Sequence, residues 1–338
     1  MKQLITSLAV MAILGVTVAI AVNRSATGNH VDAVQNGGGP GQSPATIDVK
    51  VEEKNPWTNL RVNNRPKDFQ FAIVTDRTGG RRPGVFTRAV EKINLLQPEF
   101  VVSVGDLIEG YTEDPGQWAL EWSEFESKIE QLQMPFFMCA GNHDITNTPM
   151  SDEWKRKFGR TYYHFKYHNV LFLVLNTEDK PAPGKLPYYI SPEQQKWAAD
   201  VLNQNKDVRW TFVILHKPTW TYPNADPNVC GWAGIDAALR GRRYTVFAGH
   251  KHQYQRTVIR GREHYMLATT GGASNLSGIQ NGRFDHFVWV TMKDNGPQIA
   301  NLLLDGVAGR NVGIPGGVPK ARKRKVKKPR AKKKPKKK

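Results

Sequence analysis

The chain has 338 residues, of which 39% are hydrophobic, so it can form one large domain or two modest ones with a sizeable core, and this composition argues against global disorder. Its formal net charge is +18, but residues 320–338 hold 14 lysines and arginines and no acid, which leaves +4 for the remainder. The folded part is therefore only mildly basic, and the strong positive charge belongs to a C-terminal tail.

The N-terminus has the pattern of an export signal. Lys2 precedes an apolar stretch over residues 4–22, and residues 19–21 (Ala-Ile-Ala) give the small-x-small pattern of a cleavage site. We expect a signal peptide over residues 1–21 and an extracytoplasmic protein, either periplasmic or secreted. The stretch also reaches the lower length limit of a membrane-spanning helix, so an uncleaved membrane anchor is the alternative. Residues 22–65 are rich in Gly, Asn, Pro and Ser and predict a flexible linker.

Five apolar runs predict strands, and each run is followed by a polar side chain. The runs cover residues 69–74, 100–104, 134–140, 210–215 and 244–248. We interpret the run over residues 134–140 as a buried central strand. The polar residues that follow the five runs are, in order, Asp76, Asp106, Asn142 with His143, His216, and His250 with His252. Because these side chains offer only oxygen and nitrogen, they indicate one convergent metal site.

Helical and strand patterns connect these runs. Residues 85–97 have apolar positions at helical spacing and return the chain to the second run, which predicts a βαβ unit. Asp114 followed by Pro115 predicts the start of a second helix, and Ser191 begins a capping box ahead of another. Residues 162–167 and 170–176 follow one another without a helix, which indicates that a second sheet with antiparallel pairs begins there. Further consecutive strands are predicted over residues 253–260, 264–269, 285–292 and 299–305.

The ordered motifs resemble those of the calcineurin-like metallophosphoesterases. They are Asp76, residues 105–109 (Gly-Asp-Leu-Ile-Glu), residues 141–144 (Gly-Asn-His-Asp), His216 and residues 249–252 (Gly-His-Lys-His). From residue 306 the hydrophobic periodicity is lost and a self-repelling Lys/Arg-rich run follows, which predicts a disordered tail over residues 306–338. The resemblance covers residues 66–305 and implies an α/β protein there, a four-layer α/β/β/α sandwich of two mixed sheets. It also implies hydrolysis of phosphate mono- or diesters by a water molecule that two divalent metal ions (Mn, Fe or Zn) activate. A catalytically inactive protein of the same fold, attached to polyanions by its basic tail, is the alternative.

The resemblance assigns roles to single residues. Asp106 would bridge the two metals, Asp76 and His252 would hold the first metal, and Asn142, His216 and His250 would hold the second. His143 would face the leaving oxygen as a proton donor or charge stabiliser, and Glu109 or Asp144 would orient its ring.

Three positions depart from the family pattern or add to it. Thr78 stands where the family has a metal-binding histidine, so water or Thr78 itself would complete the first metal site, and we expect that site to be the weaker one. The related purple acid phosphatases have a metal-binding tyrosine where this chain has Glu109, so Glu109 could compensate as a ligand. Arg77, next to the expected phosphate pocket, is a candidate for binding the anionic substrate. The other interpretation of Arg77 is a solvated basic loop.

The remaining expectations concern cysteines and partners. Cys139 and Cys230 could form a disulfide in an oxidising compartment or remain as two free thiols. The basic tail is suited to polyanions or to an anionic membrane surface. We expect a phosphoester substrate and no obligate protein partner.

Overall fold

The computed structural model describes residues 65–180 and 182–309. The expected signal peptide or anchor, nearly all of the linker and the tail from residue 310 onwards lie outside these described residues. None of the helices within the two ranges has the length and hydropathy that a bilayer crossing requires.

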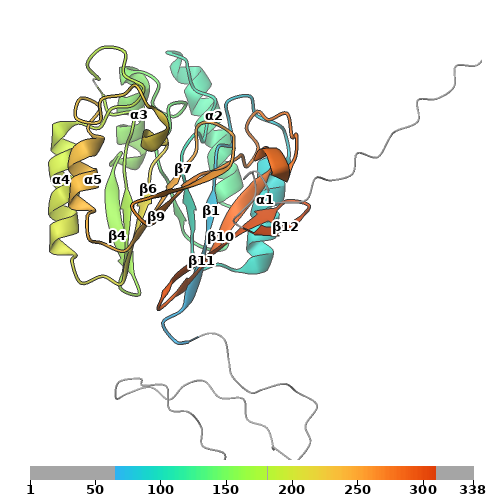
Figure 1. Ribbon diagram of the computed structural model, residues 1–338. Helices are drawn as coiled ribbons and strands as arrows, with labels where there is room; N and C mark the ends of the chain where they lie inside the picture. The colour runs from blue at the N-terminus through green and yellow to red at the C-terminus, as the bar shows by residue number, and fades with distance from the viewer. Residues whose placement is uncertain (1–64, 181, 310–338) are drawn as a thin grey trace, which may run out of the picture. The chain divides into compact units, whose positions relative to one another are not determined.

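Two six-stranded sheets form the centre of the described unit (Figure 1). The first sheet has the order β12-β11-β10-β1-β2-β3. Its strands are β1 (Phe69–Val74), β2 (Val101–Ser103), β3 (Phe136–Phe137), β10 (His286–Lys293), β11 (Gly296–Leu303) and β12 (Gly306–Gly309). Since β1, β2 and β3 are parallel to one another while β1 and β10 are antiparallel, this sheet is mixed.

The second sheet has the order β4-β5-β6-β7-β9-β8. Its strands are β4 (Tyr163–Tyr167), β5 (Val170–Val174), β6 (Trp210–Ile214), β7 (Tyr244–Ala248), β8 (Gln255–Ile259) and β9 (Arg262–Met266). The four inner strands, β5, β6, β7 and β9, are parallel to one another. The edge strands β4 and β8 pair antiparallel with β5 and β9. This sheet is therefore also mixed.

Helices cover the outer face of each sheet. They are α1 (Val85–Leu96), α2 (Pro115–Ile129), α3 (Thr148–Phe158), α4 (Pro192–Gln204) and α5 (Trp232–Ala238). Side chains of α1, α2 and α3 form one apolar cluster with the first sheet, and side chains of α4 and α5 form another with the second sheet. Figure 1 shows α4 and α5 on one side of the paired sheets and α1 on the other. Together with the cluster between the sheets, this arrangement confirms the four-layer α/β/β/α sandwich.

Local sequence signals account for these elements. In β1, Phe69, Phe71 and Ile73 pack between the sheets while Ala72 and Val74 pack under the helices, so both faces are buried and the run is continuously apolar. The predicted capping residues Asp114 and Ser191 accept hydrogen bonds from main-chain amides in the first turns of α2 and α4. A proline in the first turn of each helix has no amide hydrogen to satisfy there.

Two predictions about strands were wrong. The run over residues 134–140 is not a central strand: only Phe136 and Phe137 pair, and they form the edge of the first sheet. The run is apolar because its alternate side chains pack against helices on one side and the second sheet on the other. The sheet also continues beyond the expected end of the domain at residue 305, since β12 pairs with β11 after a tight turn. Its sequence, Gly-Val-Ala-Gly, has no strand pattern that would have predicted it.

Candidate metal centre and active site

The predicted ligands converge at the carboxyl ends of strands from both sheets. Asp76 and Asp106 follow β1 and β2 of the first sheet, whereas His216 and the pair His250 and His252 follow β6 and β7 of the second. The ligand atoms form two groups, and within each group all of them lie within 4.8 Å of one another. One group is Asp106 with His216 and His250, and the other is Asp76 with Asp106 and His252. Asp106 belongs to both groups. The structure thus brings together the residues that the motifs suggested.

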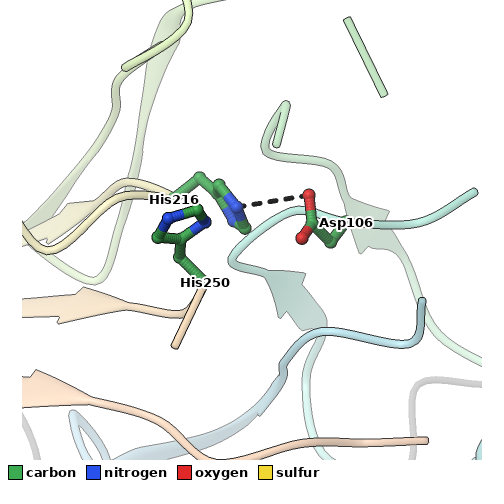
Figure 2. A group of neighbouring side chains, drawn as sticks. All are labelled: Asp106, His216 and His250. Carbon is green, nitrogen blue, oxygen red and sulfur yellow. Dashed lines mark ion pairs between the residues drawn. The ribbon is translucent and has the colours of Figure 1, made fainter. Parts of the chain in front are cut away.

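Figure 2 shows the first of these groups, in which the imidazoles of His216 and His250 and the carboxylate of Asp106 point toward one another. His216 Nε2 lies 3.2 Å from Asp106 Oδ1 and 2.8 Å from Asn142 Oδ1. The other ring nitrogen, Nδ1, lies 2.9 Å from the carbonyl oxygen of Val104 and donates to it. This hydrogen bond keeps a proton on Nδ1, so the neutral form of the ring presents the lone pair of Nε2 that a metal ligand needs.

The second group repeats this arrangement. His252 Nδ1 donates to the carbonyl oxygen of Ala273 at 2.7 Å, and Nε2 faces Asp76 Oδ1 at 3.5 Å. The hydroxyl of Thr75 and the main-chain amide of His250 donate to the Asp76 carboxylate at 2.5 and 2.6 Å. Asp76 is therefore oriented before any ligand arrives.

The electrostatics of the cluster suit bound cations. Burial opposes the ionisation of Asp76, but a hydrogen bond from His252 and the charges of His216 and His252 hold its pKa well below the usual range. Burial likewise opposes protonation of His216, yet the Asp106 carboxylate raises the pKa of His216 to about 9. Both shifts show that the two carboxylates stabilise positive charge between them. Burial, with the charges of His216 and Lys217, lowers the pKa of His250 to about 3, so its ring stays neutral and able to bind a metal.

The backbone at the site is closely packed and partly strained. A Cβ atom at Gly141 would lie 2.3 Å from Asp106 Oδ1, and one at Gly249 would lie 2.2 Å from Asp76 Oδ2, so both positions require glycine. Asp106, His250 and His252 have φ angles of 57°, 75° and 50°, a region that side chains other than glycine seldom adopt. Such conformations persist where the surroundings enforce them, and they are common at functional sites.

His143 lies beside the cluster but is oriented differently from the prediction. Its main-chain amide donates to Asp106 Oδ1 at 3.0 Å, and its Nδ1 lies 2.5 Å from the carbonyl oxygen of Glu109. The main chain of Glu109, and not its carboxylate, therefore orients the ring. The other ring nitrogen, Nε2, faces Gly79: a Cβ atom added to Gly79 would lie 3.2 Å from it.

Asp144 does not orient the His143 ring either. Its buried carboxylate accepts hydrogen bonds from the amides of Gly141, Asp106, Leu107 and Ile108. Burial and the charge of Asp106 raise the pKa of Asp144 to about 7. This carboxylate joins the two motif loops that carry Asp106 and Asn142, so its contribution is to hold those loops together.

The two side chains that the sequence offers as further ligands of the first metal have other partners. The Glu109 carboxylate accepts from the amides of Gly79, Gly80 and Arg81 at 2.7–3.2 Å and is absent from both ligand groups. The Thr78 hydroxyl lies 2.7 Å from the carbonyl oxygen of Ile108 and 2.9 Å from that of Asp106 and donates to these atoms. Thus neither side chain is oriented as a replacement for the missing histidine.

Arg77 is a structural residue and not the exposed substrate contact that its position suggested. Its side chain is only 2% exposed, and its terminal nitrogens donate to the carbonyl oxygen of Leu107 and to Glu124 at 2.6 and 2.7 Å. The guanidinium also lies over the rings of Phe86 and Phe125. Since it points into the helical layer, it cannot also bind a substrate at the metal centre.

The cysteines do not form the disulfide that was one of the two expectations. Both are buried free thiols. Cys139 packs between the two sheets, whereas Cys230 packs on the outer face of the second sheet under α4 and α5. Because that sheet separates the two side chains, no pairing is possible in this fold.

Two parts of the site lie outside the motifs. The sequence of residues 271–274 (Gly-Gly-Ala-Ser) suggests a backbone wall at the site, and the carbonyl of Ala273 does orient His252. Tyr111 was not predicted from the sequence, because it lies in a loop with no motif of its own. Its ring contacts His143 with centroids 4.6 Å apart, and its hydroxyl accepts from Asn142 Nδ2 at 2.9 Å.

The two-sheet sandwich and the paired carboxylate and imidazole groups at one edge define a protein of the metallophosphoesterase class. Comparison with known families agrees, because the calcineurin-like phosphoesterase model matches residues 69–254, more than half of the chain. This chain belongs to that family.

Individual relatives share only part of their length with it. Human serine/threonine-protein phosphatase CPPED1 is 33% identical over 141 residues, which cover 39% of this chain and 44% of the human protein. The mouse CPPED1 is 29% identical over 237 residues, or 62% of this chain and 75% of the mouse protein. Among solved structures, a dimetal phosphatase of Danio rerio has a TM-score of 0.54 with 14% identity, over 71% of this chain and 96% of that one. At that identity the structural likeness supports the fold alone.

Proposed function

We propose that this chain is a metal-dependent phosphoesterase with two metal ions that share Asp106. The observation that carries the proposal is the presence of two ligand groups, each with its own imidazole nitrogens, that have the Asp106 carboxylate in common. The donor set of oxygen and imidazole nitrogen suits Mn, Fe or Zn. Bound divalent ions lower the pKa of water and stabilise the charge on a phosphoryl oxygen.

The residues of the chain then orient the reacting groups. Asp76, His252 and Asp106 would hold the first ion, and Asn142, His216 and His250 would hold the second together with Asp106. His143 Nε2 faces Gly79 beside the cluster, and from there it would donate a hydrogen bond or a proton to the leaving oxygen. The hydrogen bond between Nδ1 and the Glu109 carbonyl keeps a proton on Nδ1, so a proton on Nε2 makes the ring cationic at the moment of donation.

The substrate class follows from the site and from the relatives together. Phosphate mono- and diesters both fit the proposed chemistry. CPPED1 is named as a serine/threonine-protein phosphatase, which supports including phosphoserine and phosphothreonine among the substrates tested.

The test is hydrolysis of p-nitrophenyl phosphate and bis(p-nitrophenyl) phosphate by the full chain with Mn²⁺, before and after chelation. We expect activity that chelation removes and that added metal restores. His250→Ala should lower kcat/KM on the order of a hundredfold or more, since it removes a proposed ligand. His164→Ala, which changes an exposed histidine of β4, is the matched control and should leave activity unchanged.

The same experiment separates this proposal from the inactive alternative. A protein that binds Mn²⁺ but turns over neither a monoester nor a diester, whatever metal is supplied, would favour a binding protein of the same fold. Equal activity in His250→Ala and wild type would contradict the proposed centre.

We also propose that the protein is exported, on the basis of the apolar stretch over residues 4–22 and the small-x-small sequence near its end, residues 19–21. Sequencing the N-terminus of the mature protein distinguishes the two forms: a start near residue 22 indicates cleavage, and an intact N-terminus in the membrane fraction indicates an anchor. Intact chain in the cytoplasm would contradict export.

A further inference from the structure

Tyr111 occupies an unusual place for a tyrosine outside the family motifs. It lies in the loop between β2 and α2, and 61% of its surface is exposed. Nevertheless its hydroxyl accepts from Asn142 Nδ2 at 2.9 Å, and its ring meets that of His143 at 4.6 Å with an interplanar angle of 78°. One exposed side chain therefore contacts both a proposed metal ligand and the proposed acid.

The backbone holds Tyr111 in this position despite local strain. Gly110 and Tyr111 have φ angles of 56° and 51°, which is unfavourable for tyrosine. The two amides are fixed by Glu121 Oε2 at 2.8 Å and by the Thr146 hydroxyl at 3.2 Å. A Cβ on Gly110 would lie 1.7 Å from the carbonyl oxygen of His143, so the turn is pressed against the motif loop. Strain of this kind persists only where the surroundings enforce it.

The hydroxyl of Tyr111 has a clear effect on Asn142. An amide side chain has one oxygen, and only that atom can bind a cation. While Nδ2 donates to Tyr111, Oδ1 points toward His216 Nε2 at 2.8 Å, which is the side of the second ligand group. By accepting from Nδ2, the Tyr111 hydroxyl holds Asn142 in the orientation in which it can act as a ligand.

The ring of Tyr111 has a separate effect. Its edge-on contact with His143 places a flat, solvent-exposed aromatic surface next to the group that faces the leaving oxygen. An aromatic leaving group could stack on this surface, and such pairs gain stabilisation beyond simple burial.

From these contacts, and resting on the proposed function, we propose that Tyr111 positions Asn142 for metal binding through its hydroxyl and favours aromatic leaving groups through its ring. Two substitutions separate the effects. Tyr111→Phe removes the hydroxyl and keeps the ring, whereas Tyr111→Ala removes both. Tyr167→Phe is the control. Tyr167 ends β4 beside the first residue of β5, away from the carboxyl ends of the strands that carry the site, and its hydroxyl donates to Glu99.

The first measurement is calorimetric titration of the metal-free full chain with Mn²⁺. We expect both Tyr111 variants to weaken the tighter binding event about tenfold, as changes to groups that orient a ligand do, and Tyr167→Phe to leave it unchanged. Circular dichroism confirms that each variant is folded. Wild-type affinity in Tyr111→Phe would overturn the positioning role.

The second measurement is the ratio of kcat/KM for phenyl phosphate to that for cyclohexyl phosphate, two leaving groups of similar size of which only one is flat. The intrinsic difference in reactivity cancels when this ratio is compared between variants. Tyr111→Phe should keep the wild-type ratio, and Tyr111→Ala should lower it about three- to tenfold. An unchanged ratio in Tyr111→Ala would overturn the role of the ring. If the wild type hydrolyses neither ester, the proposed function fails and so does the leaving-group preference, but the titration still decides whether Tyr111 positions Asn142.

Discussion

At the scale of single residues, main-chain carbonyls decide how the imidazoles at the site act. Val104, Ala273 and Glu109 each accept from an Nδ1 atom, and they do so for His216, His252 and His143 respectively. In every case Nε2 is directed toward the site. Main-chain carbonyls therefore orient these three rings.

The two metal sites that we propose should bind with unequal affinity. The first would have Asp76, His252 and the shared Asp106, and neither Thr78 nor Glu109 is oriented to add a further ligand, whereas the second would have Asn142, His216 and His250 besides Asp106. In a Mn²⁺ titration of the metal-free chain we expect two events that differ in affinity by about tenfold or more.

Single substitutions assign these events. His216→Ala should abolish the tighter event, and His252→Ala should abolish the weaker one. Two equally tight metals in the wild type would contradict the asymmetry.

His286 should make the fold sensitive to acid independently of the metal centre. Burial lowers the pKa of His286 to about 4, against 6.5 for the free side chain. Its Nδ1 donates to Asn301 Oδ1 at 2.9 Å, and its Nε2 accepts from the Ala268 amide at 3.1 Å. Both nitrogens of the neutral ring therefore have a hydrogen-bond partner, whereas a proton added to Nε2 would face the amide hydrogen of Ala268. Below pH 6.5 this histidine binds a proton in the unfolded chain but stays neutral in the folded chain. The free energy of unfolding therefore falls as the pH decreases from 6.5 to about 4.

The full loss from this group is about 3 kcal/mol, since each pKa unit corresponds to about 1.4 kcal/mol. Urea denaturation of wild type and His286→Gln at several pH values measures it. The variant cannot titrate there, so its stability should fall less between pH 6.5 and 4. Parallel curves for the two proteins would show that His286 is not responsible.

At the scale of elements, Arg77 ties the loop after β1 to helix α2. Its buried guanidinium pairs with Glu124, which also pairs with Arg81 and Lys128. Burial opposes the ionisation of Glu124, but the hydrogen bond and charge of Arg77 hold its pKa below the usual value. Through this contact the helix fixes the backbone next to Asp76.

Glu124→Gln should therefore destabilise the fold while leaving substrate affinity alone. Removing one partner of a buried pair leaves an uncompensated charge, and because the Glu124 side chain is 38% exposed we expect a loss of about 2 kcal/mol, below the range for fully buried pairs. Asp200→Asn is the control, because its ion pair with Lys196 lies on the surface of α4 and should change stability by less than about 0.5 kcal/mol. Thermal denaturation and KM are the measurements; a raised KM with unchanged stability would restore Arg77 as a substrate contact.

At the scale of the whole molecule, we propose that the basic tail and the catalytic domain act separately. The tail holds 14 cations in residues 320–338 and lies outside the part that the structure describes, while the remaining sequence carries +4. Phosphate polymers bound by such a run release counterions, which makes binding strongly dependent on salt.

Deletion of residues 320–338 should abolish binding to a phosphate polymer or to vesicles with anionic lipid. Hydrolysis of a small phosphoester should change by no more than about twofold, since screening limits the influence of distant charges on the site. Binding is followed by co-sedimentation across a salt series. Collapse of turnover on deletion would place the tail in the active site instead.

The sequence by itself determined the layered α/β fold and the set of groups at the centre of the site. Apolar runs such as residues 69–74 and 244–248 became strands with the predicted bounds, because a strand buried on both faces needs continuous apolar side chains. Within each sheet, parallel strands bring their polar endings to one edge, as they do for Asp76 and Asp106. The packing of the two sheets then brings His216, which follows β6, next to Asp106.

Only the tertiary structure decided which partner each polar side chain takes. Arg77, Glu109 and Asp144 stand next to the site in sequence, yet each is engaged by groups that the fold brings from other loops or helices. The same holds for Tyr111, whose contacts with Asn142 and His143 span more than thirty residues of chain. Local patterns specify strands and turns through short-range sterics and burial, whereas hydrogen-bond partners depend on which distant segments pack together, and no residue spacing encodes that.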